Sequence, residues 1–168
     1  SVIGVALATG GLPERVETML RHIQNELFDV GADLANPVVT NPTWEPLRII
    51  PECIDRLEAW CDELSEDLPR LRSFILPGGT PAGSYLHLAR TIVRRAERSA
   101  WAAVEAHGTD EGDEERPGGV NPLAVKYLNR LSDLLFIMSR VANGTDGEIL
   151  WVPGGERNPA GAPKGDTR

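Results

Sequence analysis

The sequence predicts an all-α protein, an antiparallel up-and-down helical bundle of about five helices. Three observations support this fold class. Apolar residues recur every three or four positions in four long segments, as they do along an amphipathic helix. Prolines and glycines concentrate between these segments, where turns are expected. Almost no stretch alternates apolar with polar residues in the way that a half-buried strand requires.

The chain opens with an apolar stretch, SVIGVALATG, which we interpret as the end of a helix whose beginning is missing. After Gly10 and Gly11, residues 12–34 are predicted to form the first long helix. Its apolar positions at helical spacing are Val16, Leu20, Ile23, Leu27, Val30 and Leu34. The next segment, ANPVVTNPTWEP, has three prolines in twelve residues and is predicted to be a loop.

A second long helix is predicted to begin at Pro51, because proline suits the first helical turn, and to end near Pro69. Its predicted buried stripe comprises Ile54, Leu57, Cys61, Leu64 and Leu68. The two cysteines, Cys53 and Cys61, lie about 12 Å apart along this helix, which is too far for a disulfide. We therefore expect core thiols in a reducing compartment, the cytoplasm.

A third helix is predicted from about residue 81 to residue 107, stopping at Gly108. The acidic loop after it, GTDEGDEERPGG, lacks the alternating oxygen ligands of an EF-hand, so no calcium site is expected. Asn121 followed by Pro122 is typical of an N-cap and the first residue of a fourth helix, which continues to Gly144.

The C-terminal part of the chain is expected to leave the bundle. The run EILWV is expected to form a small extended segment. Beyond it, PGGERNPAGAPKGDTR holds seven Gly or Pro in sixteen residues, which predicts a disordered tail. The bundle domain is accordingly assigned to residues 1–152 and the tail to residues 153–168.

Composition excludes several classes of function. A net charge of −8 disfavours non-specific nucleic-acid binding, so any anion site must be local. No apolar run reaches the length of a membrane span. The P-loop pattern is absent, and His22, His87 and His107 lack the partners of a di-iron or zinc site, so no metal held by protein ligands is expected. We interpret His87 as a hydrogen-bonded structural histidine.

The third helix carries an unusual row of arginines. Arg90, Arg94 and Arg98 follow one another at i, i+4 spacing, where like charges repel by a few tenths of a kcal/mol. The single Glu97 does not neutralise them all. Projected on a helix, this arc also holds His87 and Trp101, and the core-facing arc comprises Leu86, Ala89, Val93, Ala96, Ala100 and Val104.

Two interpretations of the arginine row remain open. It is either a solvated charged face or a polyanion site, in which forked guanidinium donors bind phosphate oxygens. The preceding PGGTPAGS favours the second if its backbone N–H groups are exposed at the helix start. Polar residues of the fourth helix, namely Asn129, Arg130 and Asp133, favour it as well. Phe74, Trp101 and Phe136 supply either flat apolar surface beside the charge or buried core.

Three segments in this order resemble the ATP:cob(I)alamin adenosyltransferases of the propanediol-utilisation type: IQNELFDVGADL, FILPGGTPAGSYLHLARTIVRRAER and NPLAVKYLNRLSDLLFIMSR. The resemblance covers most of residues 1–152. The family's nucleotide loop, T-x-T-G-D-x-G-x-T, is not in this sequence, and its place would precede Ser1. As given, the chain therefore lacks part of the ATP site that the resemblance implies.

The resemblance implies that a Co(I) corrinoid, cobalamin, attacks the 5′ carbon of ATP, giving adenosylcobalamin and triphosphate. Magnesium and arginines then hold the charge that develops on triphosphate. Arg94 and Arg95 match the family's phosphate-contacting pair, and Asn129 matches its nucleotide-binding asparagine. Arg98, on the same face, is counted among the ATP contacts. Glu97 is expected to orient Arg94 or the water shell of the metal.

The resemblance also assigns roles to aromatic residues and to a partner subunit. Phe74 is placed against the lower corrin face, where it displaces the axial ligand and makes Co(II) easier to reduce. Phe136 and Trp151, within ILWV, are expected to complete this apolar wall. The implied assembly is a homotrimer with active sites between subunits, where Arg90 pairs with an aspartate of its neighbour. A corrinoid reductase and an adenosylcobalamin-dependent mutase are candidate partners; nucleic acid and membrane are not.

A function from another class is kept as the alternative: a non-catalytic helical bundle that binds an acidic partner through its arginine row. Such binding would be abolished by salt and would show no preference for ATP. An adenosyltransferase would instead give an ATP-dependent change in the corrinoid spectrum under reducing conditions.

Overall fold

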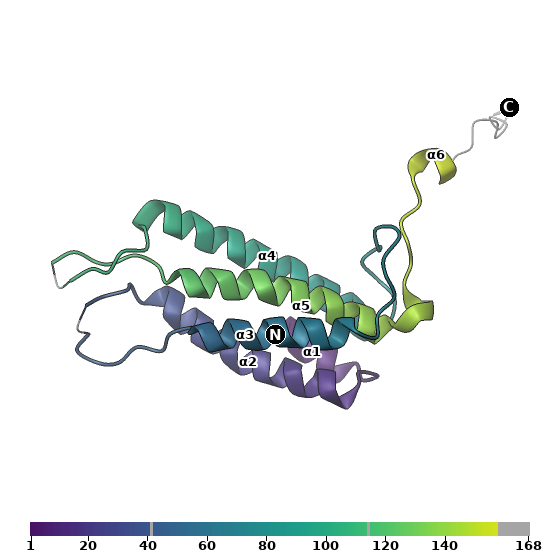
Figure 1. The fold of residues 1–168 in the computed structure, drawn as a ribbon, viewed down its shortest axis with the longest axis horizontal. Helices are drawn as coiled ribbons and strands as arrows, with labels where there is room; N and C mark the ends of the chain where they lie inside the picture. The colour runs from purple at the N-terminus through teal and green to yellow at the C-terminus, as the bar shows by residue number, and fades with distance from the viewer. Residues whose placement is uncertain (41, 114, 158–168) are drawn as a thin grey trace, which may run out of the picture.

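The computed structural model describes residues 1–40, 42–113 and 115–157. These contain six helices: α1 (Val2–Ala8), α2 (Glu14–Ala35), α3 (Pro51–Ser65), α4 (Pro81–His107), α5 (Pro122–Gly147) and α6 (Gly154–Arg157). The long helices α2 to α5 lie side by side and run alternately up and down (Figure 1), so the predicted fold class is confirmed. Within the described ranges there is no strand, only two isolated bridges.

The core is built around α5, which packs mainly against α4 and α3. Its fully buried residues recur at i, i+3, i+4 and i+7, because that spacing returns a side chain to the same side of a helix. They include Leu131, Leu134, Leu135 and Met138. The short helix α1 packs against α4 and α2, in agreement with the helical interpretation of the opening stretch.

The helix starts follow from capping. The hydroxyl oxygen of Thr80 accepts a hydrogen bond from the Gly83 N–H at 3.1 Å, and Asn121 caps α5 through the Leu123 N–H at 3.0 Å. Proline occupies the first turn of α3, α4 and α5, as predicted. Gly108 ends α4 with φ 72°, a left-handed conformation that glycine adopts without strain.

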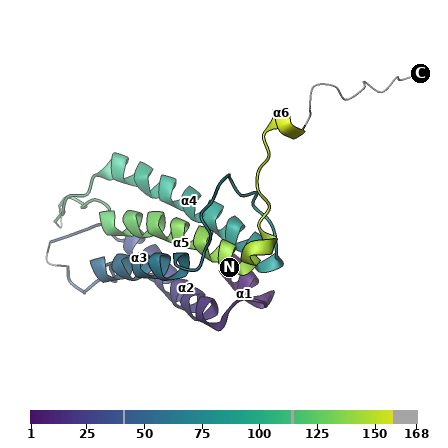
Figure 2. The same cartoon turned by 45° about the vertical axis from the view of Figure 1, so that its right-hand side comes forward.

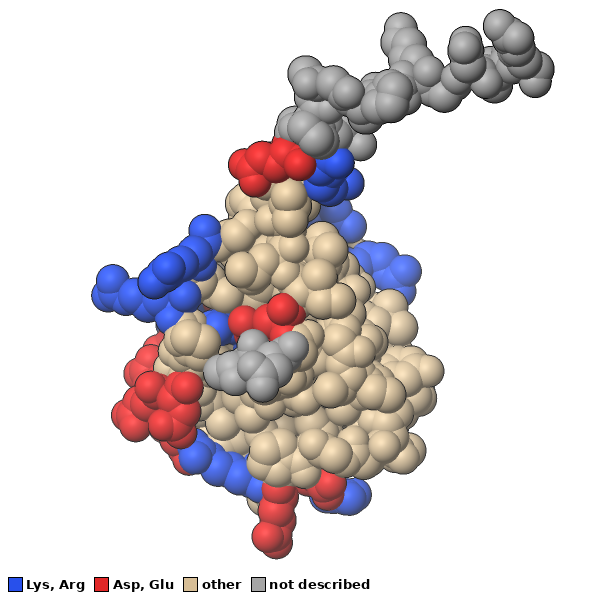
Figure 3. All heavy atoms as spheres, turned by 90° about the vertical axis from the view of Figure 1, so that its right-hand side faces the viewer, with Lys and Arg blue, Asp and Glu red and all other residues tan. Residues whose placement is uncertain are grey.

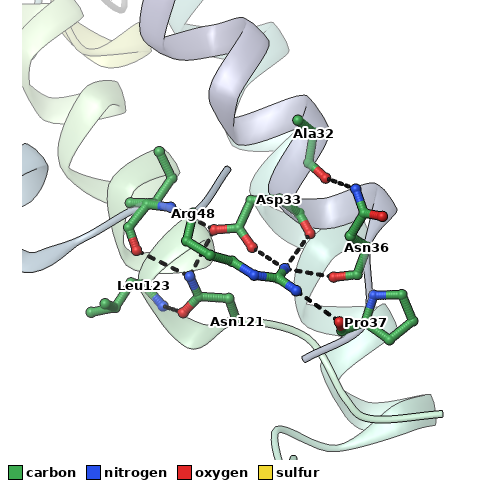
Figure 4. A network of polar contacts seen from close by, with 8 residues as sticks. Ala32, Asp33, Asn36, Pro37, Arg48, Asn121 and Leu123 are labelled. Carbon is green, nitrogen blue, oxygen red and sulfur yellow. Dashed lines mark hydrogen bonds and ion pairs between the residues drawn. The ribbon is translucent and has the colours of Figure 1, made fainter. Parts of the chain in front are cut away.

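A buried carboxylate fixes the predicted 35–46 loop to the bundle (Figure 4). Asp33, 1% exposed, accepts hydrogen bonds from Arg48 Nη1 at 2.6 Å, from the Ile49 N–H at 2.7 Å and from Asn121 Nδ2 at 2.7 Å. The apolar pattern had predicted Leu34 as the buried neighbour, which was wrong: Leu34 is 36% exposed. The side chain of Asp33 is buried instead, and this is tolerated because each of its carboxylate oxygens accepts a hydrogen bond.

A second buried carboxylate joins α2, α3 and α5. Glu26, 5% exposed, accepts a hydrogen bond from Tyr127 Oη at 2.7 Å and another from Arg56. Burial acts to raise the pKa of Glu26, but the hydrogen bonds from Tyr127 and Arg56 outweigh it and the pKa is lowered. The carboxylate therefore stays ionised inside the bundle.

Some predicted burial on α3 and α4 was also wrong. Ala96, assigned to the core arc of α4, is exposed, and Glu97 is buried instead. Helix α3 ends at Ser65, so Leu68 lies beyond it. Cys53 and Cys61 are free thiols, as expected, but only half-buried. Burial, followed by the charge of Asp133, raises the pKa of Cys61 to about 11.

The segment after α5 is extended, as expected, and it has a partner that the sequence did not reveal. Residues 73–76, here called the Phe74 strap, run beside residues 149–151 at one end of the bundle (Figure 2). Within the predicted tail, residues 154–157 form a short helix, so disorder was wrong there. Residues 158–168 lie outside the described residues, and for them the tail stays a prediction.

Over the part of the chain that is described, no helix has both the length and the apolar character needed to cross a membrane.

Candidate functional site

The arginine row lies on α4, and the structure joins part of it to α5. Arg94 is exposed, and its Nη1 lies 3.8 Å from Glu97 Oε2. Glu97 is buried and accepts a hydrogen bond from Asn129 Nδ2 at 2.8 Å. Three residues predicted for the ATP site therefore converge between α4 and α5.

The other two predicted phosphate contacts are left free. Arg95 and Arg98 are exposed, and within the described residues neither side chain forms an ion pair or a hydrogen bond. Arg130, by contrast, is engaged by Asp133 at 3.3 Å and donates to Asn129 Oδ1 at 2.9 Å. Free guanidinium groups are the ones available to an external anion.

A cavity of about 310 Å³ lies at the N-terminal part of α4, one turn from Arg94. Arg90, the first of the row, lies in its wall, with its guanidinium carbon 5.3 Å from the centre of the Phe136 ring. The lining residues are Leu71, Ser73, Phe74, Ile75, Pro77, His87, Arg90, Thr91 and Phe136. The cavity thus joins apolar rings to the arginine row.

Phe74 is held at the mouth of this cavity and is 76% exposed, so it is not a core residue. Its carbonyl accepts a hydrogen bond from the Trp151 N–H at 2.7 Å, and the two rings meet edge to face at 5.9 Å. Ser73 Oγ donates to the Trp151 carbonyl at 2.9 Å. Phe74, Phe136 and Trp151 therefore lie in one region of the molecule.

This end of the molecule presents a surface that is uncharged over much of its area, with both basic and acidic side chains around its edges (Figure 3). Large apolar residues exposed along the paired segments are Phe74, Leu76, Ile149, Leu150, Trp151 and Val152. Such a contiguous patch indicates a binding surface rather than ordinary solvated protein.

Asn143, near the C-terminal end of α5, clamps the PGGT turn and was missed by the sequence reasoning. Its Oδ1 accepts hydrogen bonds from the Thr80 N–H at 2.9 Å and the Thr80 hydroxyl at 3.0 Å, and its Nδ2 donates to the Gly78 carbonyl at 2.9 Å. A Cβ on Gly79 or Gly83 would collide with this amide. The only available signal was a polar residue just before Gly144.

The clamp limits the anion-binding interpretation of PGGTPAGS. Two backbone N–H groups of this segment, those of Thr80 and Gly83, are already bound within the protein. The turn positions the strap and caps α4, and these two N–H groups are not available to bind phosphate.

His87 was predicted to be hydrogen-bonded, and this was wrong. The side chain is 4% exposed, yet in the described part of the chain neither Nδ1 nor Nε2 has a hydrogen-bond partner. Burial and the positive charge of Arg90 lower the pKa of His87, with Glu148 acting weakly in the opposite direction.

A larger cavity of about 450 Å³ lies elsewhere, between α1, α2 and α4, and holds none of the arginines. It is lined mainly by apolar residues, including Leu27, Phe28 and Ile92. Among the described residues no three His, Cys, Asp or Glu side chains converge on a metal position. The chemistry-bearing groups therefore belong to the smaller cavity and the arginine row.

The family model for cobalamin adenosyltransferase matches residues 1–142. The chain belongs to the cobalamin adenosyltransferase family. The corrinoid adenosyltransferase of Mycobacterium tuberculosis (strain H37Rv) is 59% identical over 157 residues, covering 94% of this chain and 76% of the relative. That of Bacillus subtilis (strain 168) is 41% identical over 150 residues, covering 88% of this chain and 70% of the relative.

Solved structures agree with this membership. A variant of the PduO-type ATP:corrinoid adenosyltransferase from Lactobacillus reuteri, complexed with cobalamin and ATP, superposes with a TM-score of 0.70 at 30% identity. The match covers 89% of this chain and 77% of that chain. A second variant of that enzyme, complexed with ATP, gives the same TM-score over 90% of this chain and 81% of that one. The predicted corrinoid adenosyltransferase is thereby confirmed as a member of this family.

Proposed function

We propose that this cobalamin adenosyltransferase transfers the 5′-deoxyadenosyl group of ATP to a Co(I) corrinoid at the cavity behind Phe74. One observation supports this location: the exposed ring of Phe74 lies at the mouth of the cavity, and Arg90, the first arginine of the row, lies in the cavity wall. The apolar rings of the cavity could thus bind a flat apolar substrate, and the adjoining arginine row could bind a polyphosphate. The cobalt lone pair forms the bond to C5′ while the C5′–O bond breaks and its electron pair leaves with triphosphate. No general base is needed.

The arginine row provides the phosphate contacts of the proposal. Arg94, Arg95 and Arg98 are exposed on one helix, and forked donors stabilise the charge that develops on triphosphate. Glu97 is buried between Arg94 and Asn129, so it sets the position of both side chains. The hydrogen bond from Asn129 to Glu97 holds the Asn129 side chain in position to contact the nucleotide.

Magnesium fits the site only as an ion that enters with ATP. A magnesium ion bound to phosphates needs one or two carboxylates and retains several waters, so a cluster of protein ligands is not required. Glu97 is the carboxylate that pairs with Arg94 and would be the protein group beside the ion. When bound, the ion would neutralise part of the charge on triphosphate.

The corrinoid side of the site is formed by Phe74, Phe136 and Trp151. Phe74 on the strap and Trp151 on the segment beside it form an edge-to-face pair, and Phe136 lies in the cavity wall. With the Phe74 ring against the lower face of the corrinoid, the position of the axial ligand is occupied by an apolar group. The cobalt is then four-coordinate as Co(II) and accepts an electron more readily.

We also propose the homotrimer, with each active site between two subunits. Leu88 and Trp101 are exposed on α4 at 46% and 56%, and Phe28 on α2 at 84%, so α2 and α4 have apolar surface to bury. Arg90 forms no ion pair within the described chain and is free to pair with an acid of a neighbouring subunit.

The free thiols support a reducing compartment, the cytoplasm, where a corrinoid reductase and an adenosylcobalamin-dependent mutase are the expected partners.

The test is the corrinoid spectrum under anaerobic, reducing conditions. The enzyme is mixed with Mg²⁺, ATP and a chemically reduced Co(I) corrinoid, and we expect the Co(I) absorbance to be replaced by that of a light-sensitive alkyl-corrinoid. Omitting ATP or replacing it with triphosphate should prevent the change. A protein that instead binds acidic polymers in low salt and leaves the spectrum unchanged would be the non-catalytic alternative.

A further inference from the structure

His87 is a polar group without a partner in the wall of the site. It comes from the first half of α4 and lines the 310 Å³ cavity together with Arg90 and Phe136. Its ring meets that of Phe136 edge to face at 6.2 Å. Both ring nitrogens are buried, and no described side chain or backbone group bonds to either.

Such an arrangement is costly for packing alone. Leaving a buried nitrogen without a hydrogen bond destabilises the folded protein, and most buried polar groups in proteins are paired. A leucine would fill the same wall without that cost. An imidazole here is therefore explained by a contact made in another state of the site.

We infer that His87 is a corrinoid-binding residue, which hydrogen-bonds a carboxamide side chain of the substrate; this rests on the proposed function. A corrinoid is a flat apolar ring with primary amides at its rim. A neutral imidazole has one N–H donor and one acceptor, and a carboxamide offers the complement of each. A protonated imidazole would lose the acceptor and add a second positive charge beside Arg90.

The contact requires a small rearrangement, because neither nitrogen is open to solvent. The guanidinium of Arg90 lies over the Phe136 ring rather than in an ion pair. A cation–π contact of this kind contributes little to stability when it is not fully desolvated. Phe136 is the ring that meets His87, so a movement of Phe136 as the corrinoid enters would uncover the imidazole once Arg90 no longer lies over that ring.

The experiment compares His87→Leu and His87→Gln with the wild-type chain and with His107→Leu, an exposed histidine at the end of the same helix. Steady-state kinetics give separate KM values for corrinoid and for ATP. We expect His87→Leu to raise the corrinoid KM roughly fivefold to tenfold and to leave the ATP KM unchanged. His87→Gln keeps a donor and an acceptor and should stay within about threefold of the wild type. His107→Leu should change neither value.

Thermal unfolding without substrates completes the test. Since the imidazole bonds to nothing in the unliganded chain, His87→Leu should unfold at the wild-type temperature or above it. A corrinoid KM unchanged within about twofold in His87→Leu would overturn the inference, as would an equal rise in the ATP KM or a His87→Gln variant as impaired as His87→Leu. If His87→Leu does not fold, His87→Met is measured instead, and failure of both would show a structural role. A wild-type chain with no ATP-dependent turnover would overturn the proposed function first.

Discussion

At the scale of single residues, the exposure of Phe74 separates catalysis from packing. Its ring is 76% exposed, so Phe74→Ala should change the free energy of unfolding by less than about 1 kcal/mol. Turnover should fall by about 100-fold, because the ring that shapes the lower face of the corrinoid is gone. The ATP KM should hold, since the phosphates are bound elsewhere. Spectra of the enzyme with ATP and Co(II) corrinoid should lose the four-coordinate signature.

The control for Phe74 is Leu47→Ala, an exposed apolar residue, 60% exposed, in the loop at the opposite end of the bundle (Figure 1). It should leave turnover and spectrum unchanged. If bound Co(II) stays four-coordinate in Phe74→Ala, another residue excludes the lower axial ligand, and Phe136 would be the next candidate.

Arg94 is the residue on which the phosphate placement depends. Arg94→Ala should lose roughly 2–4 kcal/mol of transition-state stabilisation in kcat/KM, because a forked contact to triphosphate is removed. Arg94→Lys should fail as well, since an ammonium does not reproduce the fork. Arg21→Ala, which removes an exposed arginine of α2, is the control and should be fully active. Kinetics of Arg94→Ala within about threefold of the wild type would show that the triphosphate lies elsewhere.

Glu26 makes stability depend on pH. Its pKa is lowered in the folded protein, so its contribution is complete above the ordinary pKa of a glutamate, about 4.3, and is lost as the pH falls below that value. Glu26→Gln should lower the free energy of unfolding by about 2–4 kcal/mol at pH 7, because Arg56 loses its partner. Denaturant titrations should show this difference shrinking in acid. Glu105→Gln, at an exposed position on α4, should show no such difference at any pH.

At the scale of elements, the end of α5 positions the PGGT turn and the strap that leads into it. Asn143 makes three hydrogen bonds to that turn, and Asn143→Ala should cost about 1–3 kcal/mol in the free energy of unfolding. Because the turn follows the Phe74 strap directly, turnover should fall while the ATP KM stays constant. Calorimetry and kinetics measure the two effects. Asn25→Ala, which removes one exposed bond within α2, is the control, and equal losses in both variants would argue against the clamp.

At the scale of the whole molecule, the proposal requires association. Light scattering should give about three times the chain mass of 18.3 kDa, because apolar residues on α2 and α4 need a partner surface. Trp101→Glu should dissociate the assembly and abolish turnover while far-ultraviolet circular dichroism stays helical. Trp44→Glu, equally exposed but in the 36–50 loop, should remain associated. A monomeric wild-type protein at micromolar concentration would remove the intersubunit site.

The sequence by itself determined the fold class, the bounds of α4 and the identity of the family. Helical spacing, prolines at helix starts and Gly108 are local signals, and local signals suffice where hydrogen bonds join residues four apart. The arginine row is local for the same reason. The long motifs also carried the resemblance, which family membership confirmed.

Only the tertiary structure decided which distant groups meet. Asn129 on α5 donates a hydrogen bond to Glu97 on α4, and the Trp151 N–H donates one to the carbonyl of Phe74 on the strap. The carboxylate of Asp33 is buried in the bundle. None of these contacts follows from spacing, because each joins segments far apart in the chain whose relative position is set by packing. His87 was misjudged for this reason: a histidine on a helix does not reveal whether its neighbours donate to it or surround it with apolar rings. The chemistry of the site lies in those long-range contacts.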